Sequence, residues 1–424
     1  MTRIRLLALG HIGSHAFLKQ HYSALKANLP NLIVHLNTKS VNFSQNDKYN
    51  AMSCSDSVVN IEQFRIREHF RLSDLLGTIR PYFLRDYFLQ TASRNHLSIR
   101  KKLLLDLRQN QLRRIQQTKG YDIYQFHYCS VSNLQLMNAL PDHSKILCTF
   151  WGSDLLREET DCFEYHEMIK YLSRADLITI QNRELKEALM IKFGRNLEEK
   201  IRIAQFPGEV ELFDAIDNQI KKLKNVQEFQ ARLEINPNNI VVIIGNNANE
   251  GNQHGKIISA LTKLPEEIRD ELSIVIPCNY SKNNKAQYQQ LLHDDYRAFF
   301  GQLIIINDFL DWQDIASLRL TADYYIHLPI SDAMSATFTE ALYAGSICFS
   351  GCWLPFGRFR RIGLDFIEIE SFEHLAPQLK KAILQGNHKQ KKKNYQDRRV
   401  IIRKNFLGEQ ITHTWIDILN ELIS

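Results

Sequence analysis

The sequence predicts an α/β fold with two domains, each built on a doubly wound, Rossmann-like parallel sheet. The first observation is that short apolar runs rich in β-branched residues alternate with longer stretches of helical periodicity. The second is that a new series of such units starts abruptly at Ile240, after the turn sequence NPNN. The third is the length of 424 residues, which suits two domains of about 200 residues that each bury a core.

The amino-acid composition limits the classes of protein to which this chain can belong. With 44% hydrophobic and 24% charged residues, the chain is of the ordinary globular type, and no apolar run approaches the roughly 20 residues that span a bilayer. Its seven cysteines are scattered and lack the C-x2-C spacing of zinc sites, so we expect a reducing, cytoplasmic setting without a structural metal. The net charge of +6 favours anionic partners, but no nucleic-acid recognition motif supports a nucleic-acid partner.

The first domain opens with a strand–turn–helix unit. Ile4 to Gly10 reads as a strand, GHIGSH as a turn, and Ala16 to Leu29 as a helix. The spacing Gly10-x-x-Gly13 is not a dinucleotide fingerprint, because the third glycine is missing. Four further strands are predicted in this domain: Asn31 to Leu36, Asp122 to Tyr128, Lys145 to Phe150 and Leu177 to Ile180.

Two segments are strongly basic. Arg94 to Lys119 holds eight Lys or Arg residues against Asp106, and Lys389 to Lys404 holds eight against Asp397. The simpler interpretation, which we favour slightly, is that both are solvated surfaces and the first is a helix packed on the sheet. The other interpretation is a surface that contacts anionic lipid or a lipid-diphosphate acceptor.

The second domain contains the stretch with the clearest chemistry. Tyr324 to Pro329 predicts a buried strand, Ile330 to Ser335 a polar loop, and Ala336 to Ala344 a helix ended by Gly345. The free N–H groups at such a helix start form an anion site. The carboxylates of Asp332 and Glu340 would repel a phosphate but suit hydroxyl groups, so the stretch predicts a site for a ligand with both phosphate and sugar. The alternative is that the two acids only cap or charge the helix start.

This stretch resembles a known signature. Asp332 and Glu340 form D-x7-E followed by A-x-x-A-G, which resembles the E-x7-E signature of the retaining glycosyltransferases of family 4, with Asp332 in place of the first Glu. The resemblance implies the GT-B fold, in which two Rossmann-like domains face a central cleft. It also implies that the first acid and nearby amides contact the donor sugar and that the second acid holds the nucleotide ribose. The residues so implicated are Asp332, Ser335, Ala336, Thr337 and Glu340.

Two further loops of the second domain are expected to bind the donor. After the strand at Ile240 comes GNNANEGNQHGK, where backbone amides and a cation could approach a diphosphate. This loop and IPCNYSKNNKAQY together resemble the lipid-linked 4-acetamido-fucose transferases of enterobacterial surface polysaccharide, in which the equivalent loops belong to the donor domain. The donor residues predicted here are Gly245, Asn246, His254, Lys256, Asn279 and Tyr280.

The resemblance places the acceptor in the first domain. The sequence WGSDLLR resembles the H-G-x-D stretch of family 4, with Trp151 where that family often has His. The predicted acceptor residues are His11, Gly13, Trp151, Gly152 and Ser153. FPGEVEL resembles the turn that leaves the first GT-B domain, so we expect domains at residues 1–207 and 208–424, with the last helix packing back on the first domain.

The function that the resemblance implies is transfer of a sugar from a UDP- or dTDP-type donor to a hydroxyl group. The expected acceptor is a surface polysaccharide or a lipid-linked glycan, on the cytoplasmic side and with peripheral contact to the inner membrane face. No metal and no other cofactor is expected, because no D-x-D pair follows a strand. We favour retention of configuration, with Asp332 acting at the donor sugar. The alternative is an inverting transferase of the lipid-linked fucosamine type, which the second resemblance implies. Inversion would need a base, and the candidates are Asp154, His11 and His127.

Two other classes remain open from the sequence. A nucleotide-sugar 2-epimerase shares the GT-B architecture and forms product without an acceptor. A non-catalytic glycan-binding protein would keep both sheets and lose the donor site.

Overall fold

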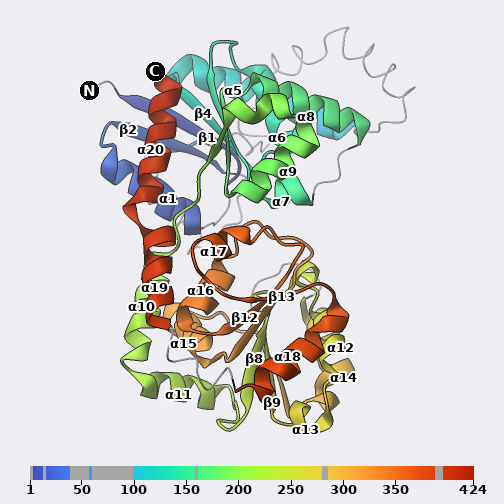
Figure 1. The fold of residues 1–424 in the computed structure, drawn as a ribbon. Coiled ribbons are helices and arrows are strands. Elements are labelled where there is room, and N and C mark those ends of the chain that lie inside the picture. Colours follow the sequence, from blue (N-terminus) through green and yellow to red (C-terminus); the bar gives the residue numbers. More distant parts are fainter. Residues whose placement is uncertain are drawn as a thin grey trace. The chain divides into compact units, whose positions relative to one another are not determined.

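The structure is a computed structural model and describes residues 3–12, 16–38, 57–59, 99–157, 161–278, 285–386 and 395–424. The chain divides into two compact units, one of Met1–Pro207 with Glu409–Ser424 and the other of Gly208–Gly408 (Figure 1). Each unit is an open, all-parallel sheet with helices on both faces. The predicted α/β fold of two Rossmann-like sheets is confirmed.

The first unit contains a seven-stranded sheet in the order β3-β2-β1-β4-β5-β6-β7. Its elements are β1 (Ile4–Ile12), α1 (Ala16–Asn28), β2 (Leu32–Thr38), β3 (Ser57–Val59), α5 (Ile99–Lys119), β4 (Ile123–His127), α6 (Val131–Leu134), η1 (Gln135–Ala139), β5 (Lys145–Thr149), α7 (Ser153–Leu156), α8 (Cys162–Arg174), β6 (Leu177–Ile180), α9 (Arg183–Phe193), η2 (Arg195–Lys200), β7 (Ile201–Ile203) and α20 (Glu409–Ile423).

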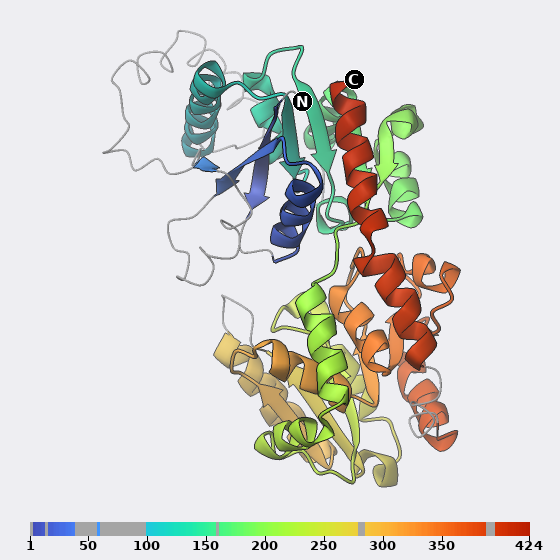
Figure 2. The same ribbon diagram turned by 90° about the vertical axis from the view of Figure 1, so that its left-hand side faces the viewer.

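The two faces of this sheet are covered by different helices. Alternate residues of β1, such as Leu6 and Ala8, join a core cluster with Tyr22 of α1 and Trp415 of α20. Figure 2 shows α5 on the opposite side of the strands from α1 and α20. The last helix of the chain therefore belongs to the core of the first unit, where its apolar residues pack with α1 and with the strands.

The second unit contains a six-stranded sheet in the order β10-β9-β8-β11-β12-β13. Its elements are α10 (Val210–Ile220), α11 (Leu223–Arg232), β8 (Ile240–Ile244), η3 (Glu250–Asn252), α12 (His254–Leu261), α13 (Glu266–Arg269), β9 (Leu272–Pro277), α14 (Lys285–Tyr296), η4 (Arg297–Phe299), β10 (Gln302–Ile306), α15 (Trp312–Thr321), β11 (Tyr324–His327), α16 (Ala336–Ala344), β12 (Ile347–Gly351), α17 (Gly357–Arg361), β13 (Ile367–Ile369), η5 (Phe372–His374), α18 (Leu375–Leu384), α19 (Tyr395–Ile402) and a π-helical turn (Arg403–Leu407).

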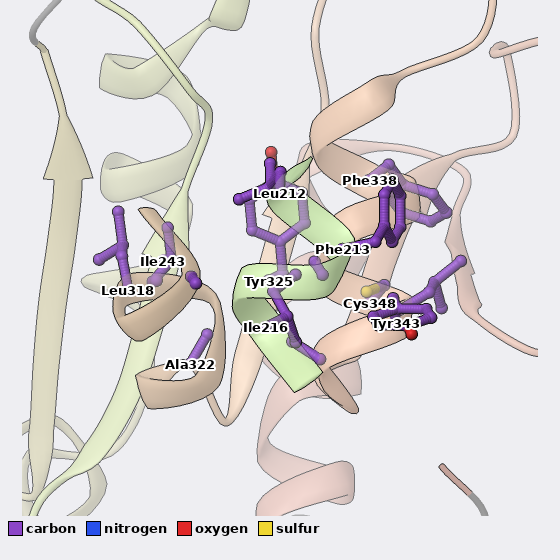
Figure 3. Packing of buried hydrophobic residues seen from close by; sticks show 14 of the residues in the cluster. Leu212, Phe213, Ile216, Ile243, Leu318, Ala322, Tyr325, Phe338, Tyr343 and Cys348 are labelled. Carbon is purple, nitrogen blue, oxygen red and sulfur yellow. The ribbon is translucent and has the colours of Figure 1, made fainter. Parts of the chain in front are cut away.

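Both faces of the second sheet are buried, which explains why its strands are apolar runs without alternation. One core cluster joins alternate strand residues to α10, α15, α16 and α19, and the other joins the remaining strand residues to α12, α14 and α18. Figure 3 shows side chains of α10, α15 and α16 around Tyr325 in the first of these clusters. The α16 helix is thereby fixed against the sheet by residues such as Phe338.

In each sheet the chain reverses its direction of travel between two neighbouring strands. These strands are β1 and β4 in the first unit and β8 and β11 in the second. Ligands of doubly wound sheets bind outside the carboxyl ends of the strands at this topological switch point. A ligand-binding site is therefore expected at the loops that follow these four strands.

The elements named from the sequence match the structure within a few residues, and β6 and α16 match at both ends. The strands β3, β7 and β13 were not predicted. Each is only three residues long, so it shows too few positions for a recognisable period.

Candidate active site

The loops after β8 and β11 lie together at the switch point of the second sheet. The side-chain amide of Gln253 donates to the carbonyl of Leu328 at 2.9 Å, and the amide of Ile330 donates to the carbonyl of Gly251 at 2.9 Å. One loop leads into α12 and the other into α16. Two helix N-termini therefore start from loops that are hydrogen-bonded to each other.

The α16 helix has a well-formed N-terminus. The Ser335 hydroxyl accepts from the amide of Phe338 at 3.1 Å and lies 3.0 Å from the Thr337 hydroxyl. At the other end Gly345 has φ +94°, a left-handed conformation that ends the helix without a side-chain penalty. The first N–H groups of a helix have no partner inside it, so the start of α16 carries partial positive charge. Ser335, Ala336 and Thr337 lie where the sequence predicted an anion site.

Asp332 is held in place by a histidine that the sequence analysis missed. His327 Nε2 lies 2.8 Å from Asp332 Oδ2, while Asp332 Oδ1 accepts from the amide of Ala333 at 2.8 Å. The His327 side chain is 2% exposed and the Asp332 side chain 29% exposed. His327 stacks parallel to Phe356, with ring centroids 5.9 Å apart. Asp332 therefore presents a fixed carboxylate, partly open to solvent, beside the start of α16.

Glu340 has a buried partner. Its Oε2 atom accepts from Nε of Arg319, on α15, at 2.9 Å, and the two side chains are 10% and 6% exposed. Glu340 was expected to hold a ribose, and its partner Arg319 was not predicted. A ribose hydroxyl would have to share this carboxylate with the guanidinium.

The loop after β8 approaches His254 closely. Gly245 has φ +64°, and a Cβ there would lie 2.3 Å from His254 Nε2, so only glycine fits. Burial lowers the pKa of His254 to about 4. Burial therefore favours the uncharged imidazole, so Lys256 is better suited than His254 to supply the positive charge predicted for this loop. Lys256 is exposed and donates to the Gln253 side chain at 3.0 Å.

The remaining predicted donor residues are placed as follows. Asn246 follows Gly245, and its side-chain oxygen accepts from Asn247 at 3.0 Å. Asn279 and Tyr280 lie outside the described residues.

In the first unit Asp154 joins two loops at the switch-point edge. Its carboxylate accepts from the amide of Cys129, after β4, at 2.7 Å, and from the amides of Trp151 and Gly152, after β5, at 2.9 and 2.8 Å. Burial raises the pKa of Asp154 to about 6, although these bonds favour the charged form. The side chain is 2% exposed and neither caps α7 nor reaches solvent as a base would. Its observed role is structural.

His127 is fully buried and both of its ring nitrogens are engaged. Nδ1 accepts from the indole N–H of Trp151 at 3.2 Å, and Nε2 lies 2.6 Å from the Tyr22 hydroxyl. A base needs a nitrogen that can reach its substrate, so this arrangement does not suit the predicted role. On the other side Gly10 of β1 is so close that a Cβ there would lie 2.0 Å from the His127 carbonyl oxygen.

The predicted acceptor residues are only partly described. Trp151, Gly152 and Ser153 lie directly after β5, as expected. His11 belongs to β1, but its side chain lies outside the description, and Gly13 lies outside the described residues.

In the described part of the chain, no group of three or more His, Cys, Asp or Glu residues could hold a metal ion. None of the described helices is long and apolar enough to cross a membrane.

Comparison with known proteins identifies the fold. No protein-family model matches the chain, and no curated protein sequence matches it. Among solved structures, HepE of Anabaena in complex with UDP and glucose superposes with a TM-score of 0.66 at 13% identity, over 99% of this chain and 100% of that one. A glycosyltransferase of Rickettsia africae gives 0.68 at 12% identity, over 100% of both chains. Sucrose-phosphate synthase of Thermosynechococcus elongatus gives 0.68 at 11% identity, over 100% of this chain and 99% of that one. At these identities the likeness establishes the fold, and the chain has the GT-B fold of these proteins.

Proposed function

We propose that the protein is a glycosyltransferase that moves a sugar from a nucleoside-diphosphate donor to a hydroxyl group of an acceptor. The observation that carries the proposal is the pairing of a fixed carboxylate, Asp332, with the N-terminus of α16 at the switch point of the second sheet. A nucleotide sugar needs both features side by side, because its diphosphate is anionic and its sugar carries hydroxyl donors. The GT-B fold and the HepE complexes with UDP and with UDP-glucose support the same proposal.

Each described group of the site has a proposed role. Asp332 accepts a hydroxyl of the donor sugar, and Glu340, aligned by Arg319, accepts a ribose hydroxyl. The start of α16 and the exposed Lys256 stabilise the charge that develops on the departing nucleoside diphosphate. In this proposal the protein itself supplies the positive potential, and transfer proceeds without a divalent ion.

Retention of configuration is the proposed stereochemical course. It requires no dedicated protein base, and the burial and hydrogen bonding of Asp154 and His127 support it, because both candidates are occupied in structural contacts. An inverting reaction would leave His11 as the remaining base named from the sequence.

The proposed acceptor is a surface polysaccharide or a lipid-linked glycan, reached from the cytoplasmic side. The basic α5 helix supports contact with an anionic acceptor or membrane surface, since Arg113 and Arg114 are exposed on it. Arg113 also donates to Asn110 one turn earlier, at 2.8 Å.

A thermal-shift panel with UDP, GDP, dTDP, CMP and NAD, each with and without EDTA, tests the donor part of the proposal. A ligand that binds only the native state raises stability by RT ln(1 + [L]/Kd). We expect one nucleoside diphosphate to raise the melting temperature selectively and EDTA to leave that shift unchanged. A shift that EDTA abolishes contradicts metal independence, and the absence of any nucleotide shift contradicts the donor site.

Incubation of the matching nucleotide sugar with and without acceptor separates the proposal from its alternatives. A transferase converts the donor to glycoside only with acceptor, whereas an epimerase forms product from the donor alone. A binding protein forms none in either case.

A further inference from the structure

Trp151 is partly exposed, yet every polar group that it has is held by the protein. Its amide donates to Asp154 Oδ1 at 2.9 Å, its carbonyl accepts from Gln181 at 3.0 Å, and its indole N–H donates to His127 Nδ1 at 3.2 Å. The three partners come from α7, from the residue after β6, and from β4. Neither the backbone nor the ring can rotate without losing a hydrogen bond to a partner in the protein.

A directed chain of buried hydrogen bonds supports the indole from behind. Because Nδ1 of His127 accepts from Trp151, the neutral ring carries its proton on Nε2 and donates to the Tyr22 hydroxyl, 2.6 Å away. Tyr22 then donates to Gln125 at 3.0 Å, and Gln125 donates to the Thr149 hydroxyl at 3.0 Å. Buried polar chains of this kind rigidify the groups that they connect and specify one orientation. These hydrogen bonds therefore fix the orientation of the Trp151 ring.

Tyr128, the neighbour of that ring, is held in a strained backbone conformation. Its backbone has φ +59°, a value that residues other than glycine rarely adopt. Its carbonyl accepts from the amide of Ser130 at 2.9 Å and from the side chain of Asn133 at 2.7 Å. Its ring meets Trp151 edge-on, with centroids 5.9 Å apart and an interplanar angle of 84°. Backbone strain of this kind is typically kept at functional sites, and this residue lies at the switch-point edge of the first sheet.

We infer that Trp151 and Tyr128 form an aromatic platform on which a sugar ring of the acceptor stacks. A pyranose presents C–H groups with partial positive charge, which suit the negative face of an indole, and its hydroxyls point outward to polar neighbours. The adjacent turn supplies such neighbours, because the hydroxyls of Ser130 and Ser132 lie 3.0 Å apart there. A core tryptophan would need neither the partial exposure nor the oriented hydrogen bonds. That the bound sugar is an acceptor rests on the proposed function, whereas the stacking of a sugar on these rings does not.

The aromatic platform gives Asp154 and His127 roles other than the catalytic ones predicted from the sequence. Asp154 and His127 are positioning residues that act through Trp151, one on its backbone and the other on its ring. Tyr128 and Gln181 were not predicted at all. Tyr128 could have been noticed only as an aromatic residue at the carboxyl end of a strand beside the switch point.

Saturation-transfer NMR with methyl β-glucopyranoside, methyl β-galactopyranoside and their N-acetylhexosamine counterparts tests the platform. We expect transfer to the ring C–H protons of at least one glycoside in the wild type and loss of most of it in Trp151→Ala. Trp312→Ala, which removes an exposed tryptophan of the second unit, is the control and is expected to leave the signals unchanged. Equal signals in the wild type and Trp151→Ala, or no signal with any glycoside, would overturn the inference.

Tyr128→Asn covers the case in which Trp151→Ala fails to fold. Asn tolerates positive φ, so this variant is expected to melt at or above the wild-type temperature while the saturation transfer falls several-fold. An unchanged NMR signal in a folded Tyr128→Asn variant contradicts the platform. The nucleotide thermal shift, measured in the same variants, keeps the two proposals apart: glycoside contact without any nucleotide shift would retain the platform and remove the transferase.

Discussion

At the scale of single residues, each acid of the candidate donor site lies against a buried basic side chain. Asp332 contacts His327, and Glu340 contacts Arg319. His327 and Arg319 both contact Tyr325. The Tyr325 ring stacks with His327, and its centroid lies 6.0 Å from Cζ of Arg319. The carboxylates are thus fixed from within the protein before any ligand arrives, which is the preorganisation that a binding site needs.

Removal of Arg319 is expected to destabilise the second unit strongly. Arg319→Met leaves the carboxylate of Glu340 buried and unpaired, which costs about 3–5 kcal/mol. Urea denaturation measures this cost, and adding Glu340→Gln to the same chain is expected to recover much of it. Glu228→Gln, which breaks the exposed pair with Lys224, is the control and is expected to change stability by less than about 0.5 kcal/mol. Equal effects at the two sites would show that the Arg319–Glu340 pair is not buried as described.

Two glycines with positive φ make a matched test of the loop after β8. Gly245→Ala introduces both backbone strain and a Cβ that would lie 2.3 Å from His254 Nε2, whereas Gly120→Ala, at φ +60°, has nothing within 4 Å. We expect the second substitution to cost about 1–2 kcal/mol from strain alone and the first to cost about 2 kcal/mol more, as overpacked sites do. Thermal melts of the two variants give the difference. An equal loss of thermal stability in the two variants would show that His254 does not pack against the loop.

At the scale of elements, α20 completes the core of the first unit by packing on α1. His21 of α1 lies in this contact, with ring centroids 4.5 Å from Trp415 and 5.3 Å from Phe206. The Trp415 indole donates to the carbonyl of Gln205 at 2.6 Å, and Arg202 pairs with Glu421. The end of the chain is therefore held by aromatic packing and by polar contacts at two points along the helix.

The buried His21 predicts an acid-sensitive contact between α1 and α20. Burial lowers its pKa from 6.5 to about 3, so the unfolded chain binds more protons than the folded one between these values. The stability that this histidine contributes is complete above pH 6.5 and is lost as the pH falls toward 3, by about 2 kcal/mol at pH 5. Urea midpoints at pH 7 and pH 5 measure the loss. We expect His21→Phe to reduce it, and an unchanged pH dependence in that variant would contradict the account.

Elements were predictable to different degrees for physical reasons. The α16 helix could be placed because a capping serine, an apolar run and a left-handed glycine mark both of its ends. Strands of four to six residues in the second sheet could be placed because both of their faces are buried and apolar. The three-residue strands could not be placed, because their definition depends on a neighbouring strand rather than on their own sequence.

At the scale of the whole molecule, the site residues could be located more easily than their roles could be assigned. Parallel strands bring the loops at their carboxyl ends to one edge, and in the structure the loops that carry Gly245 and Asp332 are hydrogen-bonded to each other. Hydrogen-bond partners come from distant positions, and no local pattern announces them. Asp154 bonds to the amide of Cys129, 25 residues earlier, and Arg319 reaches Glu340 across 21 residues. Asp154 and His127 were therefore predicted as candidate bases for an inverting reaction, whereas the structure shows both hydrogen-bonded to Trp151.

The chemistry of Asp332 tests the central claim most directly. Asp332→Asn keeps the size of the side chain and removes its charge, so the donor sugar loses one charge-assisted hydrogen bond of about 1.5–3 kcal/mol. The assay measures sugar transfer from the nucleotide sugar selected by the thermal-shift panel, and nucleotide binding in the same preparation. Asp365→Asn, at an exposed position, is the control and is expected to match the wild type.

We predict that Asp332→Asn binds the nucleoside diphosphate within about twofold of the wild type and transfers sugar about 10- to 100-fold more slowly. A variant that transfers sugar at the wild-type rate would contradict the assignment of the donor site to the start of α16.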